Sequence, residues 1–335
     1  MKKTILVLCF LFSLSMVTKA QNYVDRAFFE ARAGFHNELD DGHYGKHFTG
    51  DFLNFQMFGN ISDNISYRIR QRLNKNPFDS DNILNATDFL YIDWRINKHW
   101  SVMFGKQEIF IGGFEYDYAP IDVYYWSDFC NQLPQSYGMG LSLGYHYDEN
   151  NTVYFQIINS PFSLGNKDEF LSYNVAWFGQ AFDWWKTIWS VNYVEAEKGT
   201  DMFYVALGNR FESGDFYLEA DFTEGINATN TDDIITNFSV VGKLNYNYRD
   251  KLNIFLKGGY DDNSYTYLGN ALSPFVYDRD YSYFGAGAEY FPLNNKDLRL
   301  HAVYYYNNED KKHNFDLGAT WQLNIKSPNK TIGKN

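Results

Sequence analysis

Long hydrophobic runs are missing from this chain of 335 residues once its first twenty residues are set aside. No later window approaches the roughly 18 consecutive apolar residues that a membrane-spanning helix needs. The mean hydropathy is −0.45, a value typical of soluble proteins. These absences exclude a helical membrane protein.

Cysteine is scarce as well, and Cys9 and Cys130 are its two occurrences. Residues 1–20 are typical of a cleaved signal peptide, because two lysines precede an apolar stretch at 5–16 and a small residue, Ala20, closes the segment. Cys9 would leave with this signal. No internal disulfide can then form, and the hydrogen bonds between strands must stabilise the fold.

An excess of basic residues is also lacking. The whole chain carries a net charge of −12, and the signal peptide takes away three lysines and no acid, so −12 becomes −15. A strongly acidic exported protein is a poor partner for a polyanion, which argues against nucleic acid as a ligand.

Aromatic residues, by contrast, make up 20% of the chain, with 28 Tyr, 30 Phe and 8 Trp. A water-soluble core rarely needs so many. A β-barrel in lipid accounts for them, because one residue of each alternating pair faces the membrane and aromatic girdles mark both interfaces. The competing class, a secreted β-sandwich, usually spans near 100 residues and would leave most of the chain unexplained.

Strict alternation supports the barrel. At 314–325, Phe315, Leu317 and Trp321 share one face with other apolar residues, and polar residues such as Asp316 occupy the other. Seven short and eight long connections alternate along the chain, which predicts a transmembrane antiparallel β-barrel of about 16 strands over 21–325 with both termini in the periplasm. Barrels of fourteen or eighteen strands remain alternatives, because the aromatic residues at 179–187 obscure the position of a turn. A polar tail follows the last strand at 326–335.

Arginines mark one early strand. Arg68, Arg70 and Arg72 alternate with apolar or uncharged residues and must therefore face the lumen, since an arginine in lipid costs about 2 to 4 kcal/mol near the midplane. They could attract anions, or they could pair with lumen acids and only set the polarity of the wall. Arg95 and Lys106 are further candidates for pore-lining, anion-contacting positions.

The longest connection, residues 105–136, is too aromatic to extend into water. We expect it to fold inward and narrow the pore, with an outer lid or a subunit contact as alternatives. Gly112 and Gly113 would allow the backbone to approach the wall closely. The further members of this constriction loop are Glu108, Phe114, Glu115 and Asp117. Together with Lys106, its charged residues have mixed signs, so the loop alone does not predict which ions the pore selects.

These motifs together resemble the phosphate-selective porin O and P family of outer-membrane porins. The resemblance rests on the Gly105-Lys106-Gln107 strand end, on the turn Gly112-Gly113-Phe114-Glu115, on the arginine-bearing strand and on the sixteen-strand spacing. It implies a trimeric barrel with an inward loop and a basic pore. The predicted function is passive diffusion of small hydrophilic solutes or ions through the bacterial outer membrane, with an anion or phosphate preference as the finer prediction.

Other functions have weaker support. Surface binding or adhesion through the outer connections at 224–236 and 261–281 is the main alternative to the channel. An outer-membrane hydrolase is the second, but no GxSxG motif accompanies His99, His146 and His301. No cofactor and no metal are predicted, because His36, His43 and His47 around Asp40 and Asp41 match no defined site.

Overall fold

A computed structural model describes residues 23–40, 43–75, 83–162, 170–196, 201–227, 238–262, 266–267, 276–277, 280–309 and 311–326. The predicted signal peptide at 1–20, the predicted tail beyond Lys326 and most of the outer connections at 224–236 and 261–281 lie outside these ranges. Within them, no helix is both long enough and apolar enough to cross a membrane.

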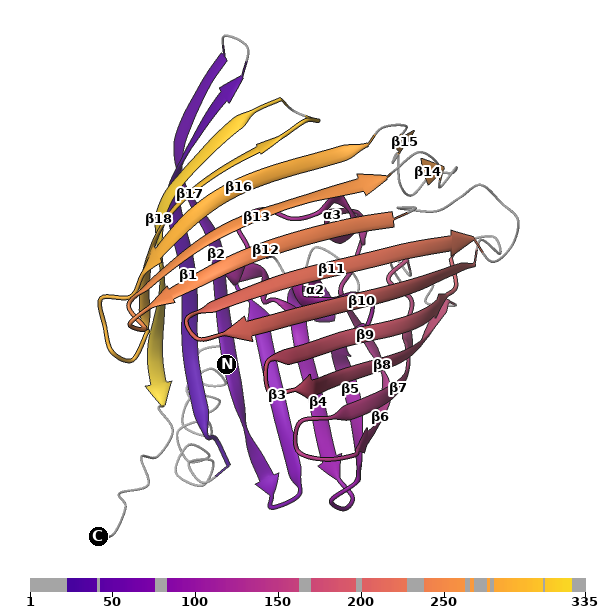
Figure 1. Cartoon of the computed structure of the whole chain (residues 1–335). Coiled ribbons are helices and arrows are strands. Elements are labelled where there is room, and N and C mark those ends of the chain that lie inside the picture. The colour runs from indigo at the N-terminus through magenta and orange to yellow at the C-terminus, as the bar shows by residue number, and fades with distance from the viewer. Residues whose placement is uncertain are drawn as a thin grey trace, which may run out of the picture.

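Sixteen antiparallel strands form one closed barrel (Figure 1). Each strand pairs with its neighbours in the chain, and β1 pairs with β18 to close the ring. The strands are β1 (Arg26–Asp40), β2 (His43–Ser62), β3 (Ile65–Arg72), β4 (Thr87–Arg95), β5 (Trp100–Glu108), β6 (Tyr137–His146), β7 (Thr152–Asn159), β8 (Leu171–Phe182), β9 (Trp185–Val194), β10 (Met202–Ser213), β11 (Phe216–Asn227), β12 (Phe238–Tyr248), β13 (Leu252–Asp262), β16 (Tyr281–Tyr290), β17 (Leu298–Asn307) and β18 (His313–Lys326). β14 (Thr266–Tyr267) and β15 (Val276–Tyr277) form a separate two-stranded sheet.

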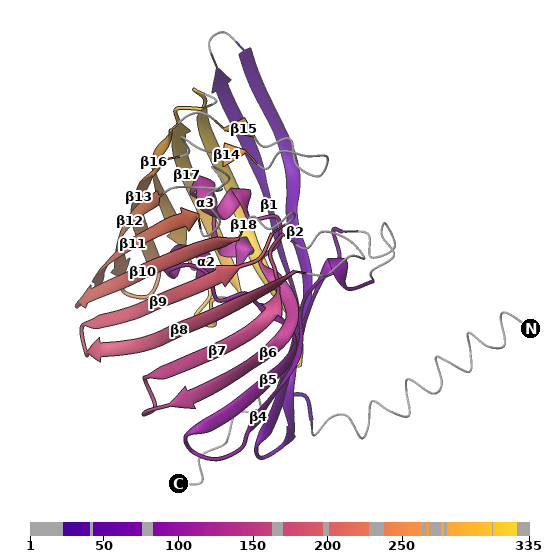
Figure 2. The ribbon, with the colours of Figure 1, turned by 90° about the vertical axis from the view of Figure 1, so that its right-hand side faces the viewer.

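The predicted fold class and strand number are confirmed. The uncertain stretch at 179–187 resolves into β8 and β9, which are joined by a tight turn at Asp183 and Trp184. The alternatives of fourteen and eighteen strands are thereby excluded. The short connections all lie at one end of the barrel, and the long β1–β2 hairpin projects beyond the opposite rim (Figures 1 and 2).

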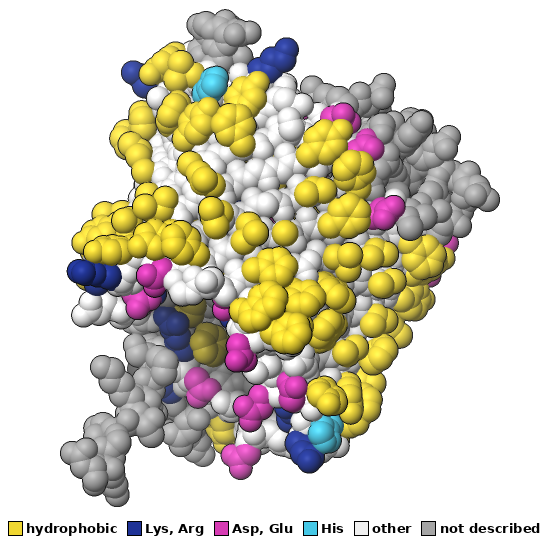
Figure 3. Space-filling model, viewed as in Figure 1, with side chains coloured by type: hydrophobic (Ala, Val, Ile, Leu, Met, Phe, Trp, Pro, Cys, Tyr) yellow, Lys and Arg dark blue, Asp and Glu magenta, His cyan; other side chains and the backbone are white. Residues whose placement is uncertain are grey.

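Each strand exposes its apolar residues on the outside and encloses its polar residues. In β18, Leu317 and Leu323 are 55% and 60% exposed, whereas Asn314 and Asp316 are 7% and 6% exposed. Figure 3 shows hydrophobic side chains spread over the outer wall. In water this pattern would need a covering layer; in lipid the outer face is already satisfied.

Stacked aromatic rings lie beside the turn between β8 and β9. The ring centroids of Phe182 and Trp184 are 5.6 Å apart, and that of Trp184 lies 6.1 Å from Phe211. Phe182 and Trp184 remain more than half exposed. Large amphipathic rings at a barrel end are typical of the girdle at a membrane interface.

Short helices occupy two connections. The 3-10 helix η1 (Ile83–Ala86) precedes β4. Between β5 and β6 the chain forms α2 (Phe114–Asp117), the 3-10 helix η2 (Pro120–Asp122) and α3 (Asp128–Gln132). Both α2 and α3 lie inside the ring of strands (Figures 1 and 2). We call residues 109–136 the lumen loop.

Candidate functional site

The lumen loop begins by following the inner wall. Neutral side chains of β7 and β9 hold it: Gln156 accepts from the backbone N–H of Phe110 at 3.0 Å, and Asn192 donates to the Phe110 carbonyl at 2.5 Å. Ser190 accepts from the N–H of Gly112 at 3.3 Å. This uncharged part of the wall therefore fixes where the loop leaves β5.

Two glycines let the loop press against its surroundings. Gly112 has a φ of 144°, and a Cβ atom there would lie 2.6 Å from Tyr116. A Cβ atom on Gly113 would lie 2.6 Å from the carboxylate of Asp221 on β11. A side chain at Gly112 would therefore clash within the loop, and one at Gly113 would push the loop away from β11.

Two aspartates of the barrel wall accept hydrogen bonds from backbone N–H groups in the first turns of α2 and α3. Asp221 accepts from the N–H of Glu115 at 2.6 Å. Asp261, on β13, accepts from the N–H groups of Asp128 and Phe129 at 3.1 and 3.3 Å. The first N–H groups of a helix have no partner within the helix, so these carboxylates satisfy them and add a favourable charge.

A buried ion pair joins the loop to β13. The Lys257 ammonium lies 2.6 Å from the Glu115 carboxylate, and both side chains are at least 93% buried. Ser127 donates its N–H to the same carboxylate at 2.9 Å. Burial would raise the pKa of Glu115, but Lys257 and the Ser127 hydrogen bonds outweigh it and leave the pKa below its ordinary value. Glu115, predicted to lie in the constriction, thus fastens the loop to the wall.

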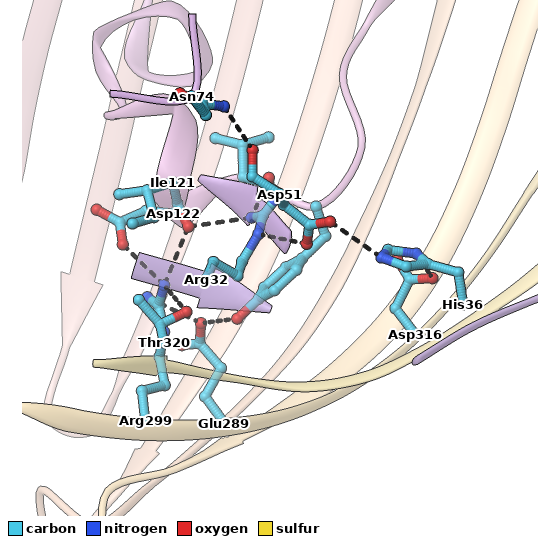
Figure 4. A network of polar contacts seen from close by, with 12 residues as sticks. Arg32, His36, Asp51, Asn74, Ile121, Asp122, Glu289, Arg299, Asp316 and Thr320 are labelled. Carbon is cyan, nitrogen blue, oxygen red and sulfur yellow. Dashed lines mark hydrogen bonds and ion pairs between the residues drawn. The ribbon is translucent and has the colours of Figure 1, made fainter. Parts of the chain in front are cut away.

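Two arginines from opposite ends of the chain hold the middle of the loop (Figure 4). Arg32 on β1 donates to the carbonyls of Ile121 and Val123 at 3.0 and 2.8 Å. Arg299 on β17 donates to the same Ile121 carbonyl at 3.2 Å and forms an ion pair with Asp122 at 2.9 Å. Asp51 and Glu289 provide further carboxylates around the two guanidinium groups: Arg32 to Asp51 at 3.2 Å and Arg299 to Glu289 at 3.3 Å.

Most of the loop's aromatic residues are enclosed, as the inward placement requires. Phe114 and Tyr125 are buried, and Phe110, Tyr124 and Trp126 are half-buried. Tyr124 donates its hydroxyl to Glu289 at 2.8 Å. The inward loop predicted from the sequence is therefore present, while its role as a constriction remains a prediction.

The arginine row lies on the lumen side of β3, but its members differ in their partners. Arg70 and Arg72 both pair with Asp88, at 2.9 and 2.8 Å. The guanidinium of Arg68 lies 4.2 Å from the centre of the Phe89 ring and donates to Gln56 at 3.2 Å. In the described part of the chain, Arg68 has no carboxylate within ion-pair distance, and its buried Nε atom has no hydrogen-bond partner.

Lys106 does not lie where the sequence suggested. The strand β5 continues to Glu108, and its register aligns Lys106 with Leu90 and Met139, which are exposed on the outer wall. The Lys106 ammonium donates to the Leu84 carbonyl in η1 at 2.7 Å. The connection starts at residue 109, four residues later than the predicted start at 105, and Lys106 lies in the strand on its outward face in place of a pore-lining position.

The remaining predicted residues lie at separate places. Arg95 is exposed beside the short turn after β4. Glu108 and Asp117 line a small cavity together with Gly112 and Gly113. Asp117 has its pKa raised by enclosure within the barrel, while the nearby Arg210 and Arg68 act in the opposite direction. Of the predicted constriction residues, Asp117 is the acid that stays exposed.

A pocket of about 260 Å³ lies between the lumen loop and the wall, and several of its lining residues stand close to the short turns in the chain. We call it the lumen pocket. Its polar lining comes from β11, β12, β13, β16, β17 and the loop: Glu115, Asp122, Glu219, Asp221, Lys243, Asn245, Asn253, Lys257, Glu289 and Arg299. Its aromatic lining includes Tyr118, Tyr124, Tyr217 and Phe255.

Arg32, Lys257, Asp261 and Arg299 were not identified by the sequence as functional residues. Alternation places each of them on the inner face of its strand, and this is the signal that was available. Nothing in the sequence indicates which inner residues of distant strands meet across the lumen.

The histidines show no hydrolase arrangement in the described residues. Ser101 and His146 are 2.9 Å apart, but the other ring nitrogen of His146 contacts the Thr152 hydroxyl at 2.9 Å, where a triad would have a carboxylate. Ser101 is also buried in the wall. Among these residues, no group of three or more His, Cys, Asp or Glu side chains could hold a metal ion.

A closed barrel of sixteen strands is the fold that this chain shares with solved porin structures. Residues 52–178, which include the arginine row and the whole lumen loop, match the family described as phosphate-selective porin O and P. This match confirms the resemblance predicted from the sequence. No curated protein matches the chain.

Solved structures agree on the fold. OprB from Pseudomonas putida has a TM-score of 0.64 at 11% identity, over 92% of this chain and 96% of that chain. OmpF from Salmonella typhi, in complex with daunomycin, has a TM-score of 0.59 at 14% identity, over 88% and 97%. A mutant porin of Rh. blastica has a TM-score of 0.56 at 11% identity, over 89% and 99%.

Proposed function

We propose that this protein is an outer-membrane channel for the passive diffusion of small hydrophilic solutes and ions, with the lumen loop as its constriction. The observation that carries the proposal is a loop fastened inside a closed sixteen-stranded barrel by wall residues of β1, β11, β13 and β17. A barrel of roughly 16 strands is too wide for wall side chains alone to fill.

The selectivity follows from the charges that remain unpaired. Asp88 pairs with both Arg70 and Arg72 and offsets one of their two positive charges, whereas Arg68 is the member of the row without a carboxylate within ion-pair distance in the described residues. Its charge is therefore the one that is best placed to act on a passing ion. The exposed Asp117 opposes it from the loop. We therefore propose a modest anion preference carried by Arg68, and no strong selection for phosphate.

The orientation is part of the same proposal. The short turns face the periplasm and the long β1–β2 hairpin faces outward, as in barrels with short periplasmic turns and longer outer loops. Both ends of the described chain then lie on the periplasmic side (Figure 1).

Planar-bilayer recording tests the channel. Purified, folded protein should insert in discrete conductance steps, and a salt gradient should give a small reversal potential of the sign for anions. A folded barrel that inserts without conductance would contradict the proposal and favour the adhesion alternative.

A further inference from the structure

Aromatic rings surround one ammonium group in the lumen pocket. The Lys243 Nζ atom lies 4.3 Å from the ring centre of Tyr118, which comes from the loop. It lies 6.0 and 5.8 Å from the rings of Tyr217 and Phe255, which belong to β11 and β13, the two strands that flank β12. Ring faces of this kind supply apolar contact area to a flat or ring-shaped solute.

The charges of the pocket disfavour an anion as its ligand. Five acids line the pocket, against three bases. Two of the bases are already engaged: Lys257 with Glu115, and Arg299 with Asp122 and Glu289. An anion entering the pocket would meet an excess of carboxylates and a single uncommitted cation.

A cation is disfavoured for the complementary reason. The five acids of the pocket already have partners: Lys257, Arg299 or Arg210 for four of them, and the N–H of Glu115 for Asp221. Within the described residues Lys243 makes no ion pair and lines the pocket beside the aromatic rings. Glu219 is aligned with Lys243 in the register of β11 and β12. Its ion pair is formed with Arg210 of β10, on the other side of β11. A second positive charge would be repelled by Lys243.

An uncharged, hydroxyl-rich ring uses all of these groups at once. Hydroxyl groups can donate to Glu219 and Glu289 and accept from Lys243 or Asn245, while the ring face packs on Tyr217. The volume of about 260 Å³ is near the lower limit of roughly 300 Å³ for small-molecule sites. This is room for one or two sugar rings and not for a long oligomer.

We propose that the lumen pocket is a binding subsite for small carbohydrates on the path through the channel. The inference rests on the proposed function, since the pocket would be reached from the lumen. Lys243 and the carboxylates give the hydrogen bonds, and Tyr217 gives the stacking surface.

Saturation-transfer NMR on the detergent-solubilised, folded protein tests binding independently of conductance. Glucose and maltose should give a saturable signal, and sorbitol, which has the hydroxyls of glucose without the ring, should give little. Tyr217→Leu should raise the apparent Kd about tenfold, and Lys243→Gln should raise it severalfold. Tyr248→Leu, on the exposed outer face of the neighbouring strand, is the matched control and should change nothing.

Three results would overturn the proposal: equal signals from sorbitol and glucose, an unchanged Kd in both pocket variants, or displacement of the sugar by inorganic phosphate. If Tyr217→Leu does not fold, Lys243→Gln decides alone. Conductance without sugar binding would refute this inference and leave the channel intact, whereas sugar binding without conductance would refute the channel.

Discussion

At the scale of single residues, three arginines on one face of β3 have three different surroundings. The sequence establishes that they face the lumen, because lipid excludes them from the other face. It does not establish their charge compensation, because Asp88 follows a long connection and reaches Arg70 and Arg72 through an irregularity in the pairing of β3 and β4. Both interpretations of the arginine row therefore hold in part. Arg70 and Arg72 pair with an acid of the wall, whereas Arg68 has no carboxylate within ion-pair distance in the described residues.

Replacing Arg68 by Ala should move the reversal potential toward cations, and replacing Asp88 by Asn should move it toward anions by releasing Arg70 and Arg72. One unit charge about 7 Å from a passing ion in water contributes about 0.6 kcal/mol, close to RT, so the permeability ratio should change about two- to threefold. Zero-current potentials in a KCl gradient measure this. If both variants shift the reversal potential in the same direction, the roles proposed for Arg68 and Asp88 are wrong.

At the scale of elements, the lumen loop illustrates how far the sequence reaches. Its length and aromatic content predicted the inward placement, because so many rings cannot remain in water. Its anchors could not be predicted. Arg299 and Ile121 are 178 residues apart and meet only because the closed barrel brings β17 to the loop. The position of Lys106 could not be predicted for the same reason. The sequence does not give the register of β5, and so it does not show which face of the strand carries this residue.

The Glu115–Lys257 pair should stabilise the docked loop in a pH-dependent way. The folded pKa of Glu115 is lowered, so its contribution is complete above the unfolded pKa of about 4.3 and disappears as the pH falls through the lower folded value. Lys257→Met should cost about 3 to 5 kcal/mol at neutral pH, because it leaves a buried carboxylate without its partner. Thermal unfolding of the barrel between pH 3 and 7 measures both effects.

Two further variants control this experiment. Combining Lys257→Met with Glu115→Gln should recover much of the lost stability and remove the acid-dependent part. Lys186→Met breaks a pair of similar length, 2.8 Å to Glu212, whose side chains are 38% and 32% exposed, and should cost no more than about 1 kcal/mol. Equal losses for the buried and the exposed pair would contradict the role given to Lys257.

At the scale of the whole molecule, the barrel was the most predictable feature. Lipid outside and water inside impose a two-residue period, and the short turns interrupt it at regular intervals. All seven short connections of the structure coincide with those that the sequence indicates. One outer region departs from the pattern: Gln71 and Thr87 hydrogen-bond to each other at 2.7 Å, Gln71 also donates to the Ala86 carbonyl, and Lys106 lies under η1 nearby.

Thr87 and Lys106 are 5% and 6% exposed, so η1 and its hydrogen bonds already shield these outward polar groups. A polar segment packed on the outer wall is itself costly in lipid, and we propose that η1 and the β3–β5 face beside it contact another copy of the chain in a homo-oligomer, a trimer by family resemblance. Leu90→Arg, on this face, should yield folded monomers in native mass spectrometry. Leu244→Arg on β12, with a similar exposure of 44% against 41%, should leave the oligomer intact while bearing the same lipid cost of about 2 to 4 kcal/mol. A monomeric unmodified protein, or equal behaviour of the two variants, would contradict this contact.

The carbonyl of Ile121 receives hydrogen bonds from Arg32 near the start of the chain and from Arg299 near its end. These two donors lie close together only when β1 and β18 are paired. In an open sheet the middle of the loop could not form both hydrogen bonds at once. Closure of the barrel is therefore a condition for anchoring the middle of the lumen loop at both arginines.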